Sequence, residues 1–193
     1  MAAAIDTIAE LGYGQASLAR IAEAAGTSKG VIIYHFGGKD ELIRELAAEL
    51  VARGAAYMRP RIEAEQTGMG MLRAYIEPNL AFMAENRNHV VATVEIALNA
   101  RAADGSRLFS WAFQDRSVAS ARELLVHFQR TGEFRASFDP LVMARAIRAG
   151  IDNVASLLVA DPGLDIAHHA RELADLFVRA ASPPAARHQS LEE

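Results

Sequence analysis

The sequence predicts an all-α protein of about nine helices, with a three-helix helix-turn-helix domain at the N-terminus and a larger helical domain after it. Three observations favour this fold class. Apolar residues recur every three or four positions along most of the 193 residues. Alanine, the strongest helix former, occupies 39 positions. No alternating apolar and polar run bounded by turn residues indicates a strand.

The first four predicted helices are three short ones and a long one. The short helices cover about residues 2–11, 17–25 and 28–34. Ser17 and Ser28 fit the N-cap positions of the second and third helices, and Gly26 fits the turn between them. The long helix starts near Lys39 and should bend or end at Pro60. This order, with its tight glycine turn, is typical of a helix-turn-helix.

Five longer helices follow. They cover about residues 70–86, 88–102, 107–131, 140–160 and 166–180. Pro78 should bend the first of the five, while Asp139 and Pro140 form a favourable start for the fourth. Residues 183–193 show no apolar stripe and should form a flexible tail. The chain therefore divides into residues 1–46, residues 47–182 and this tail.

Composition and charge exclude several functions. The chain has no cysteine, which excludes disulfides, thiolate metal sites and a cysteine nucleophile. A net charge of −4 argues against a protein that binds nucleic acid over its whole surface. Between Ser17 and Lys39, however, three basic residues and one acidic residue give a local charge of +2. Lys29 and Lys39 are the only lysines of the chain, so the sequence favours one small basic face.

The helix-turn-helix carries the clearest chemistry. In this motif the second helix crosses the DNA backbone and the third lies in the major groove. Ser28, Lys29 and Gly30 open the third predicted helix, where backbone N–H groups and short side chains can meet phosphates and base edges. Lys29 is the predicted base reader, because a lysine can donate to guanine N7 and O6.

A longer residue pattern surrounds this motif. Its segments are Gly12-Tyr13, Ala16–Ala22, Ala25–Gly30 and Tyr34–Leu42. The pattern resembles the N-terminal domain of the TetR family of transcriptional regulators over about residues 3–46. Ile33 stands where that family often has a tyrosine, which removes one phosphate-contacting hydroxyl, and Phe36 matches a core anchor. The resemblance implies contacts to double-stranded DNA from Ser17, Arg20, Thr27, Ser28, Lys29, Gly30, Tyr34, His35 and Lys39.

The resemblance also implies a C-terminal domain that binds a ligand and forms a dimer. Within the sequence, aromatic and polar residues of the later helices are candidate effector contacts, although core packing or side-chain pairing also explains them. Pockets in helical domains lie between helices, which places the site among the helices of residues 70–160. The candidate effector residues are Tyr75, Phe82, Glu95, Asn99, Trp111, Gln114 and Asn153.

The last two predicted helices, over residues 140–160 and 166–180, are the expected dimer interface. Their apolar stripes suit a four-helix bundle between two copies, and Gly150 permits close approach. Such a homodimer would place two recognition helices about 34–36 Å apart, which is one turn of DNA.

The sequence therefore predicts a ligand-responsive transcriptional regulator that binds palindromic DNA as a homodimer and is released by a small-molecule effector. Repression is the commoner role in the family that the sequence resembles. The alternative is a helical module that binds small molecules and has no DNA function.

No enzyme, cofactor or membrane segment is expected. The sequence contains no HExxH, GxSxG or P-loop motif. His168 and His169 are adjacent and point about 100° apart on a helix, so they cannot share a metal ion. No run of eighteen apolar residues occurs, and Asp6 and Glu10 lie in a start that lacks basic residues. We expect a cytoplasmic protein without a metal or cofactor.

Overall fold

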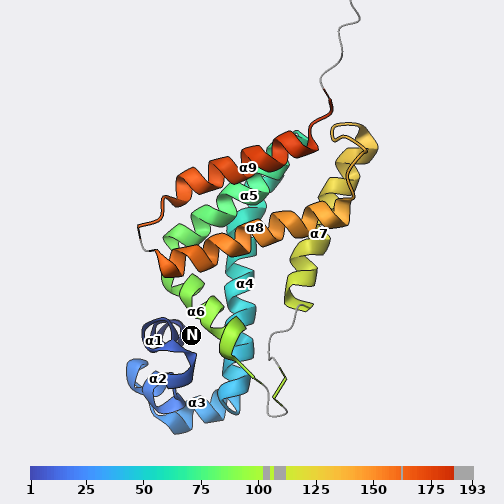
Figure 1. Ribbon diagram of the computed structural model, residues 1–193. Coiled ribbons are helices and arrows are strands. Elements are labelled where there is room, and N and C mark those ends of the chain that lie inside the picture. The colour runs from blue at the N-terminus through green and yellow to red at the C-terminus, as the bar shows by residue number, and fades with distance from the viewer. Residues whose placement is uncertain (102–104, 107–111, 162, 185–193) are drawn as a thin grey trace, which may run out of the picture.

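The computed structural model describes residues 1–101, 105–106, 112–161 and 163–184, and its regular elements are nine α-helices (Figure 1). This confirms the predicted all-α class. The N-terminal part contains α1 (Ala2–Gln15), α2 (Leu18–Ala24), α3 (Lys29–Phe36) and the long α4 (Lys39–Glu63). The remaining helices are α5 (Gly68–Glu85), α6 (Arg87–Asn99), α7 (Ala112–Thr131), α8 (Pro140–Ala160) and α9 (Ile166–Ala181). None of the described helices has the length and apolar character that crossing a bilayer requires.

The predicted caps set the helix boundaries. The hydroxyls of Ser17 and Ser28 each accept a hydrogen bond from the backbone N–H three residues later, at 3.3 Å. Gly26 has a φ of 63°, the left-handed conformation that suits the glycine after a helix. The Asp139 carboxylate caps α8 from its predicted position. Pro60 lies in the last turn of α4, which ends at Glu63.

Two hydrophobic cores organise these helices. The body core combines buried residues of α5, α7, α8 and α9, with Val90 of α6 at its edge. The head core combines buried residues of α1, α2, α3 and α4 with Ala92 and Ile96 of α6 and with Ala100, which directly follows α6. The head is therefore not built from the N-terminal residues alone, because a later helix completes its core.

Helix α6 connects the two cores. It packs along α1 from Asn88 to Glu95, as Figure 1 shows in the lower half of the molecule. Its N-terminal end reaches the body, where the Arg87 guanidinium donates to the carbonyl of Leu158 on α8 at 2.8 Å. Helix α4 also runs from the head to the body (Figure 1). The head is thus attached to the body by two helices.

The α8 stripe that motivated the dimer prediction is covered within the chain. Ile147, Ile151, Val154 and Leu158 of α8 are all buried in the body core. A Cβ at Gly150 would lie 3.0 Å from Leu173 of α9, so this glycine permits the approach of α9 in the same chain. An apolar stripe predicts that a helix face is covered, but its period does not say which helix covers it.

The role of α6 in the head core predicts a large effect from one substitution. Ile96→Ala should lower the free energy of unfolding by about 2–4 kcal/mol, because Ile96 is only 2% exposed and its loss leaves a cavity. Leu98→Ala on the same helix should change it by about 0.5 kcal/mol or less, because Leu98 is 54% exposed. Urea unfolding followed by circular dichroism measures both. Equal effects would contradict the assignment of α6 to the head core.

Candidate nucleic-acid interface

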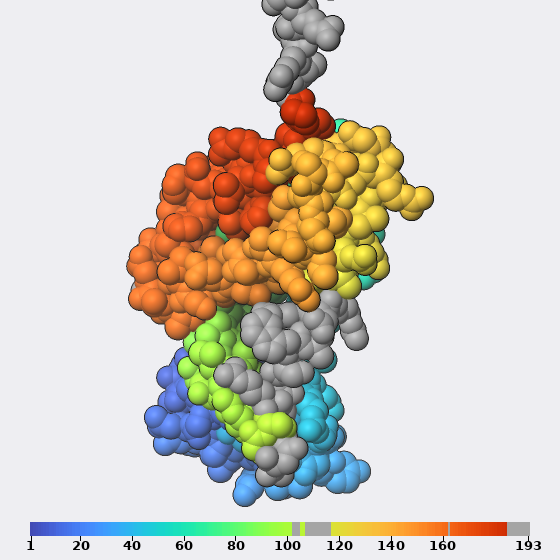
Figure 2. Space-filling view, turned by 45° about the vertical axis from the view of Figure 1, so that its right-hand side comes forward, coloured from blue at the N-terminus to red at the C-terminus, as the bar shows by residue number. Residues whose placement is uncertain are grey.

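The predicted DNA-contacting residues lie on α2 and α3, in the segments just before these two helices, and at Lys39, the first residue of α4. These segments form the lower end of the molecule in Figure 2. Eight of the nine are exposed, and Lys39 is partly buried. Tyr34 is 86% exposed and its ring contacts the ring of His35 edge to face. Phe36 points the other way and packs against the head core, as the sequence pattern predicts for an anchor.

The start of α3 is open to an approaching partner. The first N–H groups of a helix have no acceptor within it, and here they belong to the exposed residues Lys29 and Gly30. A Cβ at Gly30 would meet only the Ser28 hydroxyl at 3.7 Å, an ordinary contact. Within the described residues, no contact requires glycine at this position.

Two apolar residues of this surface escape prediction from the sequence pattern. Val31 and Ile33 are 44% and 42% exposed, and Ile32 is the buried residue between them. Three successive apolar residues on a helix are about 100° apart, so they cannot all face the core. That geometry is the signal that could have revealed them. Exposed apolar side chains on such a helix suit thymine methyl groups.

Lys39 is held against the end of α1. Its ammonium donates to the Tyr13 carbonyl at 2.9 Å and lies 4.3 Å from the centroid of the Tyr13 ring, within the range of a cation–π contact. Burial lowers the pKa of Lys39, while the neighbouring Asp40 acts in the opposite direction. An ammonium has three donors, so the contact to Tyr13 leaves others for a phosphate.

Glu95 and Asn99 lie where α6 meets α1. The Glu95 carboxylate accepts hydrogen bonds from the Tyr13 backbone N–H at 3.0 Å and from the Asn99 side chain at 3.1 Å. The two side chains share one face of α6, as the sequence predicts, and this face is turned toward the head. These two candidate effector residues therefore have partners within the chain.

The other candidate effector residues are dispersed. Tyr75 is buried in the body core and its hydroxyl donates to the Ser117 carbonyl at 3.1 Å. Phe82 packs against Tyr57 of α4, with ring centroids 5.4 Å apart. Asn153 is exposed on the outer side of α8. Trp111 and Gln114 lie outside the residues whose side chains the structure describes. The described members of this set do not surround one pocket.

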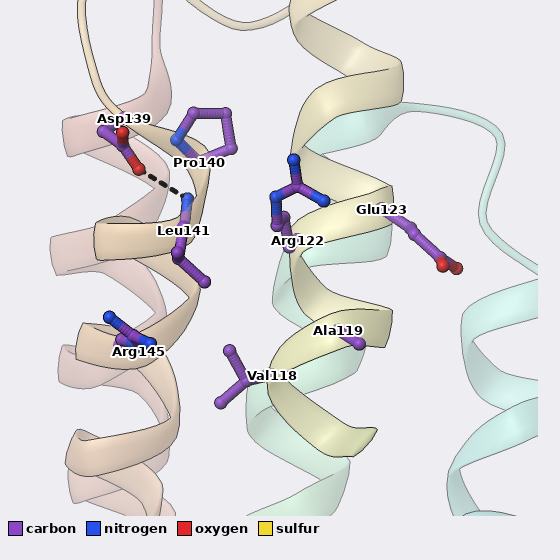
Figure 3. Close-up of a pocket in the computed structure, with 8 residues that line it drawn as sticks. All are labelled: Val118, Ala119, Arg122, Glu123, Asp139, Pro140, Leu141 and Arg145. Atoms are coloured by element: carbon purple, nitrogen blue, oxygen red, sulfur yellow. Dashed lines mark hydrogen bonds between the residues drawn. The ribbon is translucent and has the colours of Figure 1, made fainter. Parts of the chain in front are cut away.

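A groove of about 430 Å³ lies between α7 and α8 (Figure 3). In Figure 3 the Arg122 side chain reaches from α7 toward α8, whereas Glu123 points away. The Asp139 carboxylate is engaged by the backbone N–H groups of Leu141 and Val142. The residues that line the groove are Val118, Ala119, Arg122, Glu123, Asp139, Pro140, Leu141 and Arg145. Its cationic groups are thus two arginines beside apolar side chains. In the described part of the chain, no three His, Asp or Glu side chains are grouped to hold a metal ion.

Residues 1–46 match the model of the bacterial regulatory proteins of the tetR family. This match covers the four helices that begin the chain, as far as the first part of α4. Curated relatives share sequence with part of the chain. The chain is 36% identical over 78 residues to the HTH-type transcriptional regulator BetI 1 of Chromohalobacter salexigens, covering 40% of this chain and 39% of the relative. It is 29% identical over 91 residues to the fatty acid metabolism regulator protein of Bacillus subtilis, covering 47% of each. The chain thus spans less than half the length of these relatives, whose names are those of regulators rather than enzymes.

Solved structures extend the similarity to the whole fold. The fatty acid degradation regulator FadR from Bacillus halodurans has a TM-score of 0.79 at 22% identity, covering 92% of this chain and 95% of that one. FadR from Bacillus subtilis in complex with stearoyl-CoA has a TM-score of 0.78 with the same identity and coverage. The chain therefore shares the fold of these proteins over nearly its whole length.

Proposed function

We propose that this protein is a transcriptional regulator that binds palindromic double-stranded DNA as a homodimer and releases it when a small molecule binds the body. The observation that carries the proposal is the exposed surface of α3, which places a lysine, a glycine and two apolar side chains on the helix that TetR-family heads share. The apolar side chains of this face would gain free energy if a partner buried them, since apolar groups are stabilised when they leave water.

In the proposed complex α3 lies in the major groove. Lys29 reads guanine, and Ile33, four residues later on the same face of α3, contacts a thymine methyl group. The backbone phosphates are contacted from both sides of the groove by Ser17, Arg20, Thr27, Ser28, Gly30, Tyr34, His35 and Lys39. Phosphate contacts position the head and supply the salt-dependent part of the affinity, whereas base contacts select the sequence.

The second copy is proposed to pack on the outer face of α8. This face carries the exposed residues Val142, Ala146, Ala149, Asn153 and Leu157, which recur every three or four positions. Leu176 of α9, which is 57% exposed, adds to it. Small side chains let two helices approach closely, so the face suits a bundle of α8 and α9 from two copies. The interface thus stays on the two helices that the sequence predicts, but it lies on their outer residues and not on the buried stripe of α8.

The proposed effector is an amphipathic anion of the acyl-CoA type. Support comes from the FadR of Bacillus subtilis, whose structure is in complex with stearoyl-CoA. Within this chain, Arg122 and Arg145 of the groove between α7 and α8 suit phosphate groups, which arginine binds in bidentate pairs. Val118, Pro140 and Leu141 offer apolar contacts beside them. A ligand that favours one spacing of the two heads would release the operator and so relieve repression.

Selection of bound genomic fragments tests DNA binding and supplies the site for a mutant comparison. Lys29→Ala should weaken binding to the selected site more than to random DNA, because Lys29 reads a base. Lys39→Ala should weaken both and lower the salt dependence by about one phosphate contact. Fluorescence anisotropy over a salt series measures this. Arg44→Ala serves as the control, because Arg44 is exposed on α4 and pairs with Glu41. Failure of the wild-type protein to enrich any fragment would favour a ligand-binding module without DNA function.

The dimer is tested by placing a charge on the outer face of α8. Ala149→Arg should convert a particle of twice the 20.9 kDa chain mass into one of the chain mass at micromolar concentration, because two arginines would meet across the interface. Val159→Arg is the matched control, since Val159 is a similarly exposed residue on a different side of the same helix. Light scattering measures the masses. A wild-type protein at the chain mass would overturn the dimer.

The effector is tested with a thermal shift assay. Stearoyl-CoA at about 100 times its dissociation constant should raise the melting temperature by about 5–10 °C. The double variant Arg122→Ala/Arg145→Ala should lose this shift, whereas Arg171→Ala on the exposed side of α9 should retain it. A shift that survives in the double variant would place the ligand elsewhere. No shift with acyl-CoA thioesters of any chain length would reject the ligand class.

A further inference from the structure

We propose that Glu95 is a positioning residue for the DNA-contacting face, holding Tyr13 so that Tyr13 presents the ammonium of Lys39. The inference rests on the proposed function, because Lys39 is taken to contact a phosphate. It assigns to Glu95 a role in the head in place of the effector contact that the sequence predicted.

The first part of the contact is a backbone N–H that needs an acceptor. Helix α1 is broken at Gly12, whose φ of 76° and ψ of 157° are not helical. In an unbroken helix the N–H of Tyr13 would bond to the carbonyl four residues earlier. The Glu95 carboxylate of α6 instead accepts it at 3.0 Å. A Cβ at position 12 would lie 3.4 Å from the same carboxylate oxygen, so the left-handed glycine also makes room for it.

The second part lies on the other side of the same residue. The carbonyl of Tyr13 accepts the hydrogen bond from Lys39 at 2.9 Å, and the Tyr13 ring lies beneath the Lys39 ammonium. Tyr13 itself packs against the head core. Tyr13 is thus bound to Glu95 of α6 through its N–H, and to Lys39 of α4 through its carbonyl and its ring. The position of Lys39 depends on Tyr13, and the position of Tyr13 depends on Glu95.

The polar and charged groups beside Glu95 and Lys39 also favour these contacts. Asn99 donates to the Glu95 oxygen that faces Tyr13, which fixes the carboxylate on α6. Asp40 lies next to Lys39 along α4 and favours its charged form. Because a charged acceptor forms stronger hydrogen bonds than a neutral one, the carboxylate holds the broken end of α1 more firmly than an amide would.

The contact also connects the body to the DNA-contacting face. The N-terminal end of α6 is bonded to Leu158 of α8 through Arg87, and Val90 lies in the body core. A change in the body that displaces α6 would therefore change the hold on Tyr13 and Lys39. Such a change would weaken a phosphate contact without any movement inside α3.

The two lysines of the chain allow a direct test on the free protein. Acetylation with an amine-reactive ester, followed by mass spectrometry, gives the ratio of labelling at Lys39 to labelling at the exposed Lys29. Lys39 should label more slowly in the wild-type protein. Glu95→Ala should raise the ratio about threefold to tenfold, the range that corresponds to one ordinary hydrogen bond. Glu95→Gln should raise it less, because an amide oxygen still accepts.

Thr93→Ala is the matched control, because Thr93 is exposed on α6 and bonds only to its own helix at the His89 carbonyl. Its labelling ratio should equal that of the wild-type protein. An unchanged ratio in Glu95→Ala would overturn the proposal. If Glu95→Ala does not fold, as judged by its melting curve, Glu95→Gln decides the matter through the same ratio.

A double-mutant cycle on DNA tests the link to binding. If Glu95 acts through Lys39, the variant Glu95→Ala/Lys39→Ala should bind the selected site as weakly as Lys39→Ala alone. Each of the three variants should also show a salt slope reduced by about one phosphate contact. Additive losses would overturn the proposal. A wild-type protein that binds no DNA refutes the proposed function, while the labelling ratio still decides whether Glu95 positions Lys39.

Discussion

The packing of α6 against α1 is the contact on which the rest of the structure depends. Ala92, Ile96 and Ala100 close the head core, which the first four helices leave open on this side. Two alanines let the helices approach closely, and the isoleucine fills the remaining space. Without this contact the head would expose apolar surface and its two attachments to the body would become one. The orientation of α3 relative to the body therefore depends on α6 as much as on α4.

Polar contacts at the same interface fix its register. Asn88 donates to the carboxylate of Asp6 at 2.8 Å near one end of the contact, and Glu95 accepts from Tyr13 at the other. Apolar packing alone tolerates sliding between helices, whereas hydrogen bonds are met at one register only. The broken end of α1 at Gly12 creates the unsatisfied donor that makes the second contact specific. Local irregularity in one helix is thus used to align another.

Local signals made the head predictable from the sequence. The caps at Ser17 and Ser28 and the glycine at position 26 act within a few residues, so the sequence states them directly. The partners of the candidate effector residues were not predictable in this way. A polar residue on a largely apolar helix indicates that a partner is needed, but it does not identify the partner. Glu95 found its partner in the α1 backbone, 82 positions away along the chain, and no helical period encodes that pairing.

The apolar period of α8 likewise shows that a face is covered but does not identify the covering helix. The answer affects how the molecule binds DNA. Its large apolar stripe faces the body core, which leaves its outer face exposed for the second copy that we propose. One head offers a local charge of +2 on a chain of net charge −4, so a single copy gains little from phosphates at physiological salt. Pairing doubles the basic faces and makes them bind together, because the second head is already close to its site once the first is bound. A small basic face on each copy therefore suits DNA binding by two copies together, as in the proposed dimer.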